Sequence, residues 1–242
     1  MSRYLVEGVV IKNINYKDLD KIYTILTKSK GKISASAKGV RKISSRRAGN
    51  LDTLNHVVIG ISEGNSGYKT ITEVKTLNSF RKLKSSISKV SKAYFMLELV
   101  HKFLEEDHEE IKIFNLLIFS LEKMENDDKN IDFWILSYEI SLLILLGYGL
   151  TFDKCKICGR EYVDNWEVDK FNYGLGGLVC DRCDGGFVIS KGCSYVLNGV
   201  KSGKSSIDYL LKDILESDRI LKTYISFILN SEIRSPTIFD TV

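Results

Sequence analysis

Four cysteines in the second half of the chain most constrain its fold. Cys155 and Cys158 form one Cys-x2-Cys pair, Cys180 and Cys183 form another, and 21 residues separate the pairs. Two such pairs on tight turns supply the four thiolates of a closed tetrahedral site, which suits one structural zinc ion. The spacing therefore predicts an inserted four-cysteine zinc module over residues 151–189. Four protein ligands leave no open position for water, so we do not expect a catalytic metal.

An iron–sulfur cluster is the chemical alternative to zinc at this quartet, although two short cysteine pairs favour zinc. The fifth cysteine, Cys193, stands apart and is expected to be structural.

Charge is divided unevenly along the chain. Residues 1–92 hold 19 Lys and Arg against 6 Asp and Glu, a net +13, whereas residues 93–242 hold 16 against 25, a net −9. A surface as basic as the first part concentrates polyanions, so nucleic acid is the expected partner. The acidic remainder would repel DNA and is expected to bind protein instead.

The first 80 residues follow the pattern of short strands separated by polar turns. The expected strands cover residues 4–14, 22–27, 32–38, 56–62 and 68–77. Residues 32–38 alternate between small apolar and polar side chains, which predicts a half-buried strand with a basic outer face. Five such strands predict an OB-fold β-barrel over residues 1–80.

Cations gather in a long polar segment, residues 39–55, between the third and fourth expected strands. A basic loop of this length in a compact domain is usually functional. The residues expected to bind DNA are Lys38, Arg41, Lys42, Arg46 and Arg47, with Lys12, Lys30 and Lys32 in support. Because aromatic residues are few in this domain, we expect phosphate attraction to dominate over base stacking.

Helical periodicity begins near residue 80. The expected helices cover residues 90–104, 111–121, 133–146, 205–215 and 218–230. Asp132 and Ser217 are expected to cap two of them, and Gly147 to end the apolar one. The helices predict an all-α domain in two parts, 81–150 and 190–242, around the zinc module, and thus a multidomain α+β protein.

The stretch 133–150 meets the lower length limit for a membrane span and carries one charge, Glu139. Because Glu139 lies near its middle and Gly147 near its end, we expect a buried core helix instead. The N-terminus also lacks the apolar core of a secretory signal. The prediction is a cytoplasmic protein without membrane contact.

Two further patterns are weak. Residues 199–205 resemble a phosphate-binding loop but have three residues between the glycines where the motif needs four, so a polar loop at a helix start is expected. Asp18 and Asp20 are a pair that a metal-dependent nuclease could use, but no third ligand lies nearby in the sequence. A turn or ion-pair role is favoured for both.

One segment of the chain combines Thr27, Gly31-Lys32 and Lys38-Gly39-Val40-Arg41-Lys42 with Ser44-Ser45. Further segments are residues 8–10, 16–22, 146–150 before Cys155, 171–180 and 234–235. In order and spacing, these segments resemble the RecO family of bacterial DNA repair proteins, and the first resembles its most recognisable part. The chain departs from the family in having a single proline, with Leu150 where many relatives have proline nearby.

The resemblance implies an OB-fold, a helical domain with a zinc finger inserted before the last helices, and no bond-breaking catalysis. It implies a nucleoid-associated mediator that binds single- and double-stranded DNA and anneals complementary strands. It further implies action with RecR, capture of the acidic tail of single-strand-binding protein (SSB), and help in loading RecA on SSB-coated DNA. The residues considered for an apolar tail end are Tyr138, Leu142, Leu145 and Tyr148.

Two other functions stay open at this point. One is a nuclease that uses Asp18 and Asp20, and the other is an RNA-binding OB module of the translation apparatus.

Overall fold

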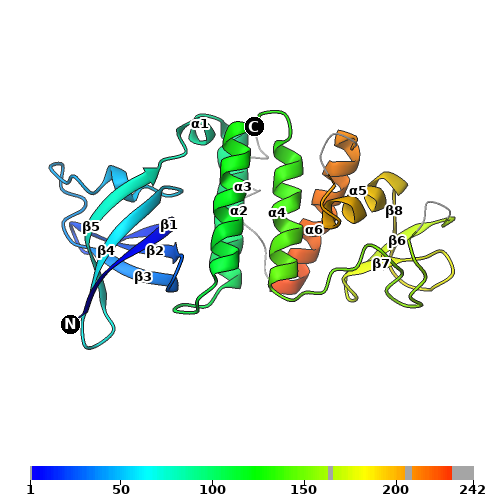
Figure 1. Cartoon of the computed structure of the whole chain (residues 1–242), viewed down its shortest axis with the longest axis horizontal. Coiled ribbons are helices and arrows are strands. Elements are labelled where there is room, and N and C mark those ends of the chain that lie inside the picture. The colour runs from blue at the N-terminus through cyan, green and yellow to red at the C-terminus, as the bar shows by residue number, and fades with distance from the viewer. Residues whose placement is uncertain (1, 163–165, 205–208, 231–242) are drawn as a thin grey trace. The chain divides into compact units, whose positions relative to one another are not determined.

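The computed structural model describes residues 2–162, 166–204 and 209–230 (Figure 1). Contacts divide the chain into two compact units, the first running from the N-terminus to Asn126 and the second starting at Asp127. Within these ranges, the first unit holds a barrel and helices, and the second holds further helices and a small sheet. The units therefore meet at a different position from the predicted domain limits at residues 80, 150 and 189, which stay predictions.

Five strands of the first unit close into a barrel in the order β1-β2-β3-β5-β4. The strands are β1 (Ser2–Tyr16), β2 (Asp20–Thr27), β3 (Gly31–Ala37), β4 (His56–Glu63) and β5 (Lys69–Asn78). Neighbours run antiparallel except β3 and β5, which are parallel and joined by a bridge between Ser36 and Thr70. This closed ring is the OB-like fold that the sequence predicts.

Alternate side chains of each strand fill the barrel, as the two-residue period of a strand requires. Tyr23, Ile25, Ile33, Ile59 and Ile71 are each at most 2% exposed in one continuous core. In β1 the register shifts between Val10 and Lys12. Because such a bulge moves the following side chains to the other face, it changes which residues of β1 look into the barrel.

The strand β3 is buried on both faces, so the prediction of a basic outer face is wrong. Lys32 is 6% exposed and Ser36 is 2% exposed. The chain just after the second helix covers this face, where Glu106 forms a bridge with Lys32. Sequence alternation could not show that a distant segment packs over the strand.

The described part of the first unit also holds the helices α1 (Arg81–Lys84), α2 (Ile87–Phe103) and α3 (Ile111–Asn126). The side chain of Ser86 caps α2 by accepting from the backbone N–H of Lys89. The helices predicted over 90–104 and 111–121 are confirmed. A 3₁₀ turn, η1 (Gly49–Leu51), interrupts the long segment between β3 and β4.

The second unit is built on α4 (Ile131–Leu145), α5 (Lys191–Lys201) and α6 (Leu211–Leu229), with α4 and α5 both packed on α6. Phe133, Leu136, Leu142 and Leu143 of α4 are buried, which confirms the predicted core helix. Within the described residues, no helix is long and apolar enough to cross a membrane.

The two ends of α4 can be compared with the sequence prediction. Asn130, rather than Asp132, occupies the N-cap position, and Asp132 lies in the first turn. Gly147 ends the helix as predicted, with a φ of +83° that favours glycine.

The C-terminal helices differ from the sequence prediction in two ways. Ser217 is not an N-cap, because α6 is one helix and the Ser217 hydroxyl donates to the Asp213 carbonyl within it at 2.8 Å. The sequence did not predict α5, although Ser190 caps it by accepting from the N–H of Cys193. Part of the helix predicted over 205–215, and the Arg234-Ser235 pair, lie outside the described residues.

Candidate nucleic-acid interface and metal centre

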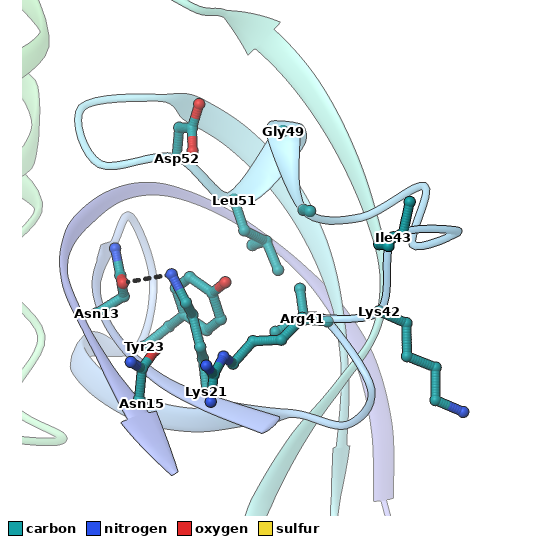
Figure 2. Close-up of a pocket in the computed structure, with 12 residues that line it drawn as sticks. Asn13, Asn15, Lys21, Tyr23, Arg41, Lys42, Ile43, Gly49, Leu51 and Asp52 are labelled. Atoms are coloured by element: carbon teal, nitrogen blue, oxygen red, sulfur yellow. Dashed lines mark hydrogen bonds between the residues drawn. The ribbon is translucent and has the colours of Figure 1, made fainter. Parts of the chain in front are cut away.

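A pocket of about 500 Å³ lies where β1, β2 and the segment between β3 and β4 meet (Figure 2). Asn13 pairs with Tyr23, and Asn15 pairs with Lys21, across β1 and β2. The bulge in β1 brings both asparagines to the face on which Tyr23 and Lys21 lie. The pocket is thus lined by polar groups that alternate along two strands.

Arg41 lines the same pocket and is held in place from two sides. Its backbone N–H donates to the Leu19 carbonyl at 3.0 Å, and its Nη1 donates to the Asp18 carbonyl at 2.9 Å. The guanidinium is exposed and keeps most of its donors free. Figure 2 shows Arg41 extending toward Asn15 and Lys21, whereas Lys42 points away from them.

A chain of hydrogen bonds orders the other side of the pocket. Lys21 Nζ donates to Asn13 Oδ1 at 3.0 Å, and Asn13 Nδ2 donates to Thr53 Oγ1 at 3.2 Å. This chain ties β2 to β1 and to the segment before β4. Sequence reasoning did not single out Lys21, Asn13, Asn15 or Tyr23. Asn13 and Asn15 are two residues apart on β1, and Lys21 and Tyr23 are two residues apart on β2. This spacing, which places each pair on one face of its strand, was the sequence signal that could have found them.

The structure separates the predicted DNA-binding residues. Four of them, Lys38, Arg41, Lys42 and Arg46, are exposed on or beside the segment between β3 and β4. Lys12 is exposed on β1, and Lys30 lies beyond the far end of β2 from Lys21, with its Nζ 5.7 Å from the centre of the Tyr4 ring. Neither Lys12 nor Lys30 lines the pocket.

Two of the predicted DNA contacts have internal partners. Lys32 is buried, and its Nζ donates to the His101 carbonyl at 2.8 Å and also to the Leu104 carbonyl. These internal acceptors argue against a DNA contact at Lys32, because they occupy its ammonium. Arg47 donates through Nη1 to the Ile71 carbonyl at 2.8 Å and through Nη2 to the Lys38 carbonyl at 2.7 Å. It fastens the loop to β5.

Asp18 and Asp20 do not form a metal centre. Asp20 Oδ1 accepts the backbone N–H of Gly39 at 2.7 Å, which is the turn role that the sequence favours. Among the described residues, the four cysteines are the only group of three or more metal-binding side chains that lie close together. The geometry gives no support to a nuclease at this turn.

The four cysteines meet as predicted. The sulfur atoms of Cys155, Cys158, Cys180 and Cys183 all lie within 4.8 Å of one another. Cys158 Sγ is 3.7 Å from Cys180 Sγ, close to the roughly 3.8 Å edge of a tetrahedron of sulfurs around zinc. Each pair sits on a turn closed by a backbone hydrogen bond, from Gly159 to Cys155 at 2.9 Å and from Cys183 to Cys180 at 3.2 Å. The cluster can bind one metal ion.

Hydrogen bonds and burial shift the pKa of two of these cysteines in opposite directions. Burial opposes ionisation of Cys155, but backbone N–H groups of Cys158, Cys180 and Ile157 outweigh it and lower its pKa to about 6. The neighbouring Cys158 sulfur, followed by burial, raises the pKa of Cys183 to about 12. A metal ion that binds the cluster would displace the protons of the cysteine thiols, because it binds thiolates. The cluster lies beside a sheet of β7 (Gly177–Val179), β6 (Asp169–Asn172) and β8 (Phe187–Ile189).

Cys193 lies apart from the cluster, buried on α5 within hydrogen-bond distance of the Ser217 hydroxyl. Burial raises its pKa to about 12. Both observations fit the structural role that the sequence predicts.

The glycine-rich segment that resembles a phosphate loop does not form one in its described part. Gly199 lies inside α5, where an added Cβ would be 2.0 Å from the Tyr209 hydroxyl. Lys201 ends the helix and pairs with Asp153 at 3.0 Å. The described part of the segment covers the end of α5 and the turn that follows it, and the predicted helix start falls on residues outside the described ranges. Ser205 lies outside the described residues.

The four candidate partner residues divide into two kinds. Tyr138 and Leu142 are fully buried in α4 and cannot contact a partner. Burial raises the Tyr138 pKa well above its ordinary value. Leu145, the last residue of α4, is 40% exposed, and Tyr148, which follows the helix, is 36% exposed. Only the second pair is accessible.

An OB-like barrel, a helical unit and a four-cysteine cluster that can bind one metal ion define the chain as a multidomain α+β protein. Two known family descriptions match the chain: "Recombination protein O N terminal" over residues 1–80 and "Recombination protein O C terminal" over residues 84–236. The chain therefore belongs to the RecO family of DNA repair proteins.

Curated relatives named DNA repair protein RecO resemble the chain over most of its length. The protein from Symbiobacterium thermophilum is 28% identical over 250 residues, which cover 100% of this chain and 98% of that protein. The protein from a Thermoanaerobacter species is 30% identical, covering 95% of this chain and 94% of that protein. The protein from Clostridium novyi is 29% identical, covering 91% and 82%.

Proposed function

We propose that this chain is a non-enzymatic DNA-binding mediator of recombination. It binds single- and double-stranded DNA through its barrel, anneals complementary strands, and acts with RecR to load RecA on SSB-coated single strands. The observation that carries this proposal is the group of exposed cations, Lys38, Arg41, Lys42 and Arg46, beside a polar pocket at one end of an OB-like barrel. The proposed place of action is the nucleoid in the cytoplasm.

The arrangement suits annealing because the cations neutralise phosphates without covering many bases. Each Lys or Arg that contacts a phosphate contributes roughly 0.7–0.9 to the slope of log K against log salt concentration. Two strands drawn to one basic surface repel each other less, and most of their bases stay free to pair. The acidic second part of the chain keeps DNA on the barrel.

The double variant Arg41→Ala with Arg46→Ala tests the interface. We expect weaker binding to every DNA sequence, a flatter salt dependence and slower annealing. The matched control, Lys112→Ala with Lys129→Ala, removes two exposed cations from α3 and the segment before α4. Unchanged affinity in the barrel variant would refute the interface. RNA of equal length serves as competitor, and stronger binding to RNA would favour an RNA-binding module instead.

Annealing of SSB-coated strands, followed by sizing of the products, tests mediation itself. Full-length annealed products support a mediator, whereas shortened strands would show a nuclease. Added RecR and RecA are expected to increase formation of RecA filaments on the coated strand. If SSB-coated strands anneal no faster with the protein than without it, the mediator role fails.

For the SSB tail we propose the accessible end of α4. Leu145 and Tyr148 offer apolar surface, and Lys156 Nζ donates to the carbonyl of Gly149, the residue after Tyr148, at 3.1 Å. An acidic peptide with an apolar end matches this combination. Leu145→Ser with Tyr148→Ala should weaken binding of the tail peptide, whereas Leu175→Ser, at another exposed site of the second unit, should not. A wild-type protein that binds no tail peptide would remove this site.

We propose zinc as the metal of the cysteine cluster. Its sulfur spacing suits a tetrahedral ion, and all four positions are taken by protein. Zinc bound there would supply no reaction chemistry and would hold the small module folded.

A further inference from the structure

We infer that the pocket at the mouth of the barrel holds one unpaired nucleotide of a single DNA strand, with its phosphate at Arg41 and its base among Asn15, Tyr23 and Asp52. This inference rests on the proposed DNA-binding function and deepens it. It adds a contact with a base to a surface that is otherwise proposed to contact only phosphates.

The size and walls of the pocket suit such a ligand. A volume of about 500 Å³ falls within the roughly 300–1,000 Å³ of small-molecule sites, and one nucleotide is a ligand of this class. Val40 and Leu51 form buried apolar walls, 2% and 1% exposed. Ile43 stands at the pocket as a fully exposed apolar side chain, a surface on which a base can pack.

The polar groups are placed for a base and not only for a phosphate. Tyr23 is 2% exposed, yet its hydroxyl lines the pocket and makes no hydrogen bond to any described residue. The Asn15 amide likewise makes no hydrogen bond within the described ranges. A hydroxyl and an amide without partners are donors and acceptors that match base edges.

The charges of the pocket orient the nucleotide. Burial raises the pKa of Tyr23 to about 12, so its hydroxyl stays a neutral donor. Asp52 lines the pocket and would repel a phosphate but accept from a base amine. In the view of Figure 2, Leu51 lies between Asp52 and Arg41. Arg41 therefore marks the phosphate side of the pocket, and Asp52 with Tyr23 marks the base side.

The consequence is a preference for single strands that phosphate contacts alone would not produce. In a duplex each base is paired and stacked, so its edge cannot enter the pocket. One nucleotide is held in each barrel, and its neighbours stay outside and available for pairing.

The test compares a short labelled single strand with a strand of equal length and charge in which abasic sites replace nucleotides. We expect the wild-type chain to bind the base-bearing strand about 3- to 10-fold more tightly. Tyr23→Phe with Asn15→Ala should bring this ratio close to unity, without changing affinity for the abasic strand or the duplex. Phenylalanine keeps the ring that packs in the barrel core, so the fold is retained.

Two controls separate the outcomes. Tyr68→Phe, which removes an exposed hydroxyl before β5, should keep the wild-type ratio. Arg41→Ala should weaken binding to both strands. Equal wild-type affinity for both strands overturns the nucleotide pocket and leaves the proposed function standing. If neither strand binds, the proposed function itself fails, and the pocket inference fails with it.

Discussion

Lys32 on β3 donates its Nζ hydrogen to the main-chain carbonyl of His101, near the end of α2, at 2.8 Å. The Leu104 carbonyl accepts from the same ammonium. A helix leaves its last carbonyls unpaired, and a cation is favourable at this end of the helix dipole. A residue that looks like a surface cation in the sequence therefore joins the barrel to α2.

Replacement of Lys32 by methionine is expected to reduce stability and spare DNA binding. Methionine keeps an apolar chain but leaves the two carbonyls without their donor. We expect a loss of about 2–3 kcal/mol in the free energy of unfolding, measured by urea titration. Lys38→Met is the control, with weaker DNA binding and unchanged stability. Weaker DNA binding by Lys32→Met at full stability would contradict this assignment.

Arg46 and Arg47 are adjacent but should behave differently. Arg47 donates to the carbonyls of Ile71 and Lys38, so Arg47→Ala should cost about 1–3 kcal/mol and speed hydrogen exchange in the loop. Arg46 is exposed, and Arg46→Ala should reduce only DNA affinity. Measurement of stability and affinity for both variants decides the point. Equal stability of the two variants would show that the Arg47 contacts do not hold the loop.

Glu139 should make stability depend on pH. Both its carboxylate oxygens are buried and make no hydrogen bond within the described residues. Burial, followed by the charge of Asp218, raises its pKa well above the ordinary 4.5, and Lys222 opposes this. The native state therefore keeps a proton that the unfolded chain loses above that value. Stability should fall as the pH rises from the unfolded pKa toward the folded one, by at most about 1.4 kcal/mol per pH unit.

Glu139→Gln should remove this dependence, because an amide imitates the protonated acid. Urea titrations between about pH 5 and about pH 8 are expected to show a flatter profile and greater stability at the alkaline end. Glu122→Gln, an exposed change on α3, should leave the wild-type profile. A wild-type profile in Glu139→Gln would mean that this carboxyl does not control the slope.

Removal of the metal should unfold the cysteine module first. Elemental analysis is expected to give one zinc per chain, and a strong chelator or Cys158→Ser should increase hydrogen exchange over β6, β7 and β8. The barrel should keep its protection, because the cysteine cluster lies in the other compact unit. Iron with visible absorption, or a metal-free protein with a protected module, would contradict a structural zinc.

Much of the fold could be predicted from local patterns. Alternating residues with a period of two indicated the barrel strands, and a period near 3.6 indicated α2, α3 and α4. Both depend only on side-chain spacing within one element. The helix α5 and the course of α6 through Ser217 were not predicted. Ser217 looks like a cap in the sequence, but its hydroxyl bonds within the helix and near Cys193 of α5.

The cysteine cluster and the uneven division of charge could be predicted from the sequence alone, because ligand spacing and summed charge are properties of the linear chain. The roles of individual cations needed the tertiary structure. Lys32 lies on β3, and Lys38 directly follows that strand. Lys32 is internal because it donates to the carbonyls of His101 and Leu104, about seventy residues away in the chain, whereas Lys38 is exposed. The pocket likewise arises from a bulge and a closing loop. Burial and pairing are set by segments far apart in the chain, and local sequence patterns do not contain that information.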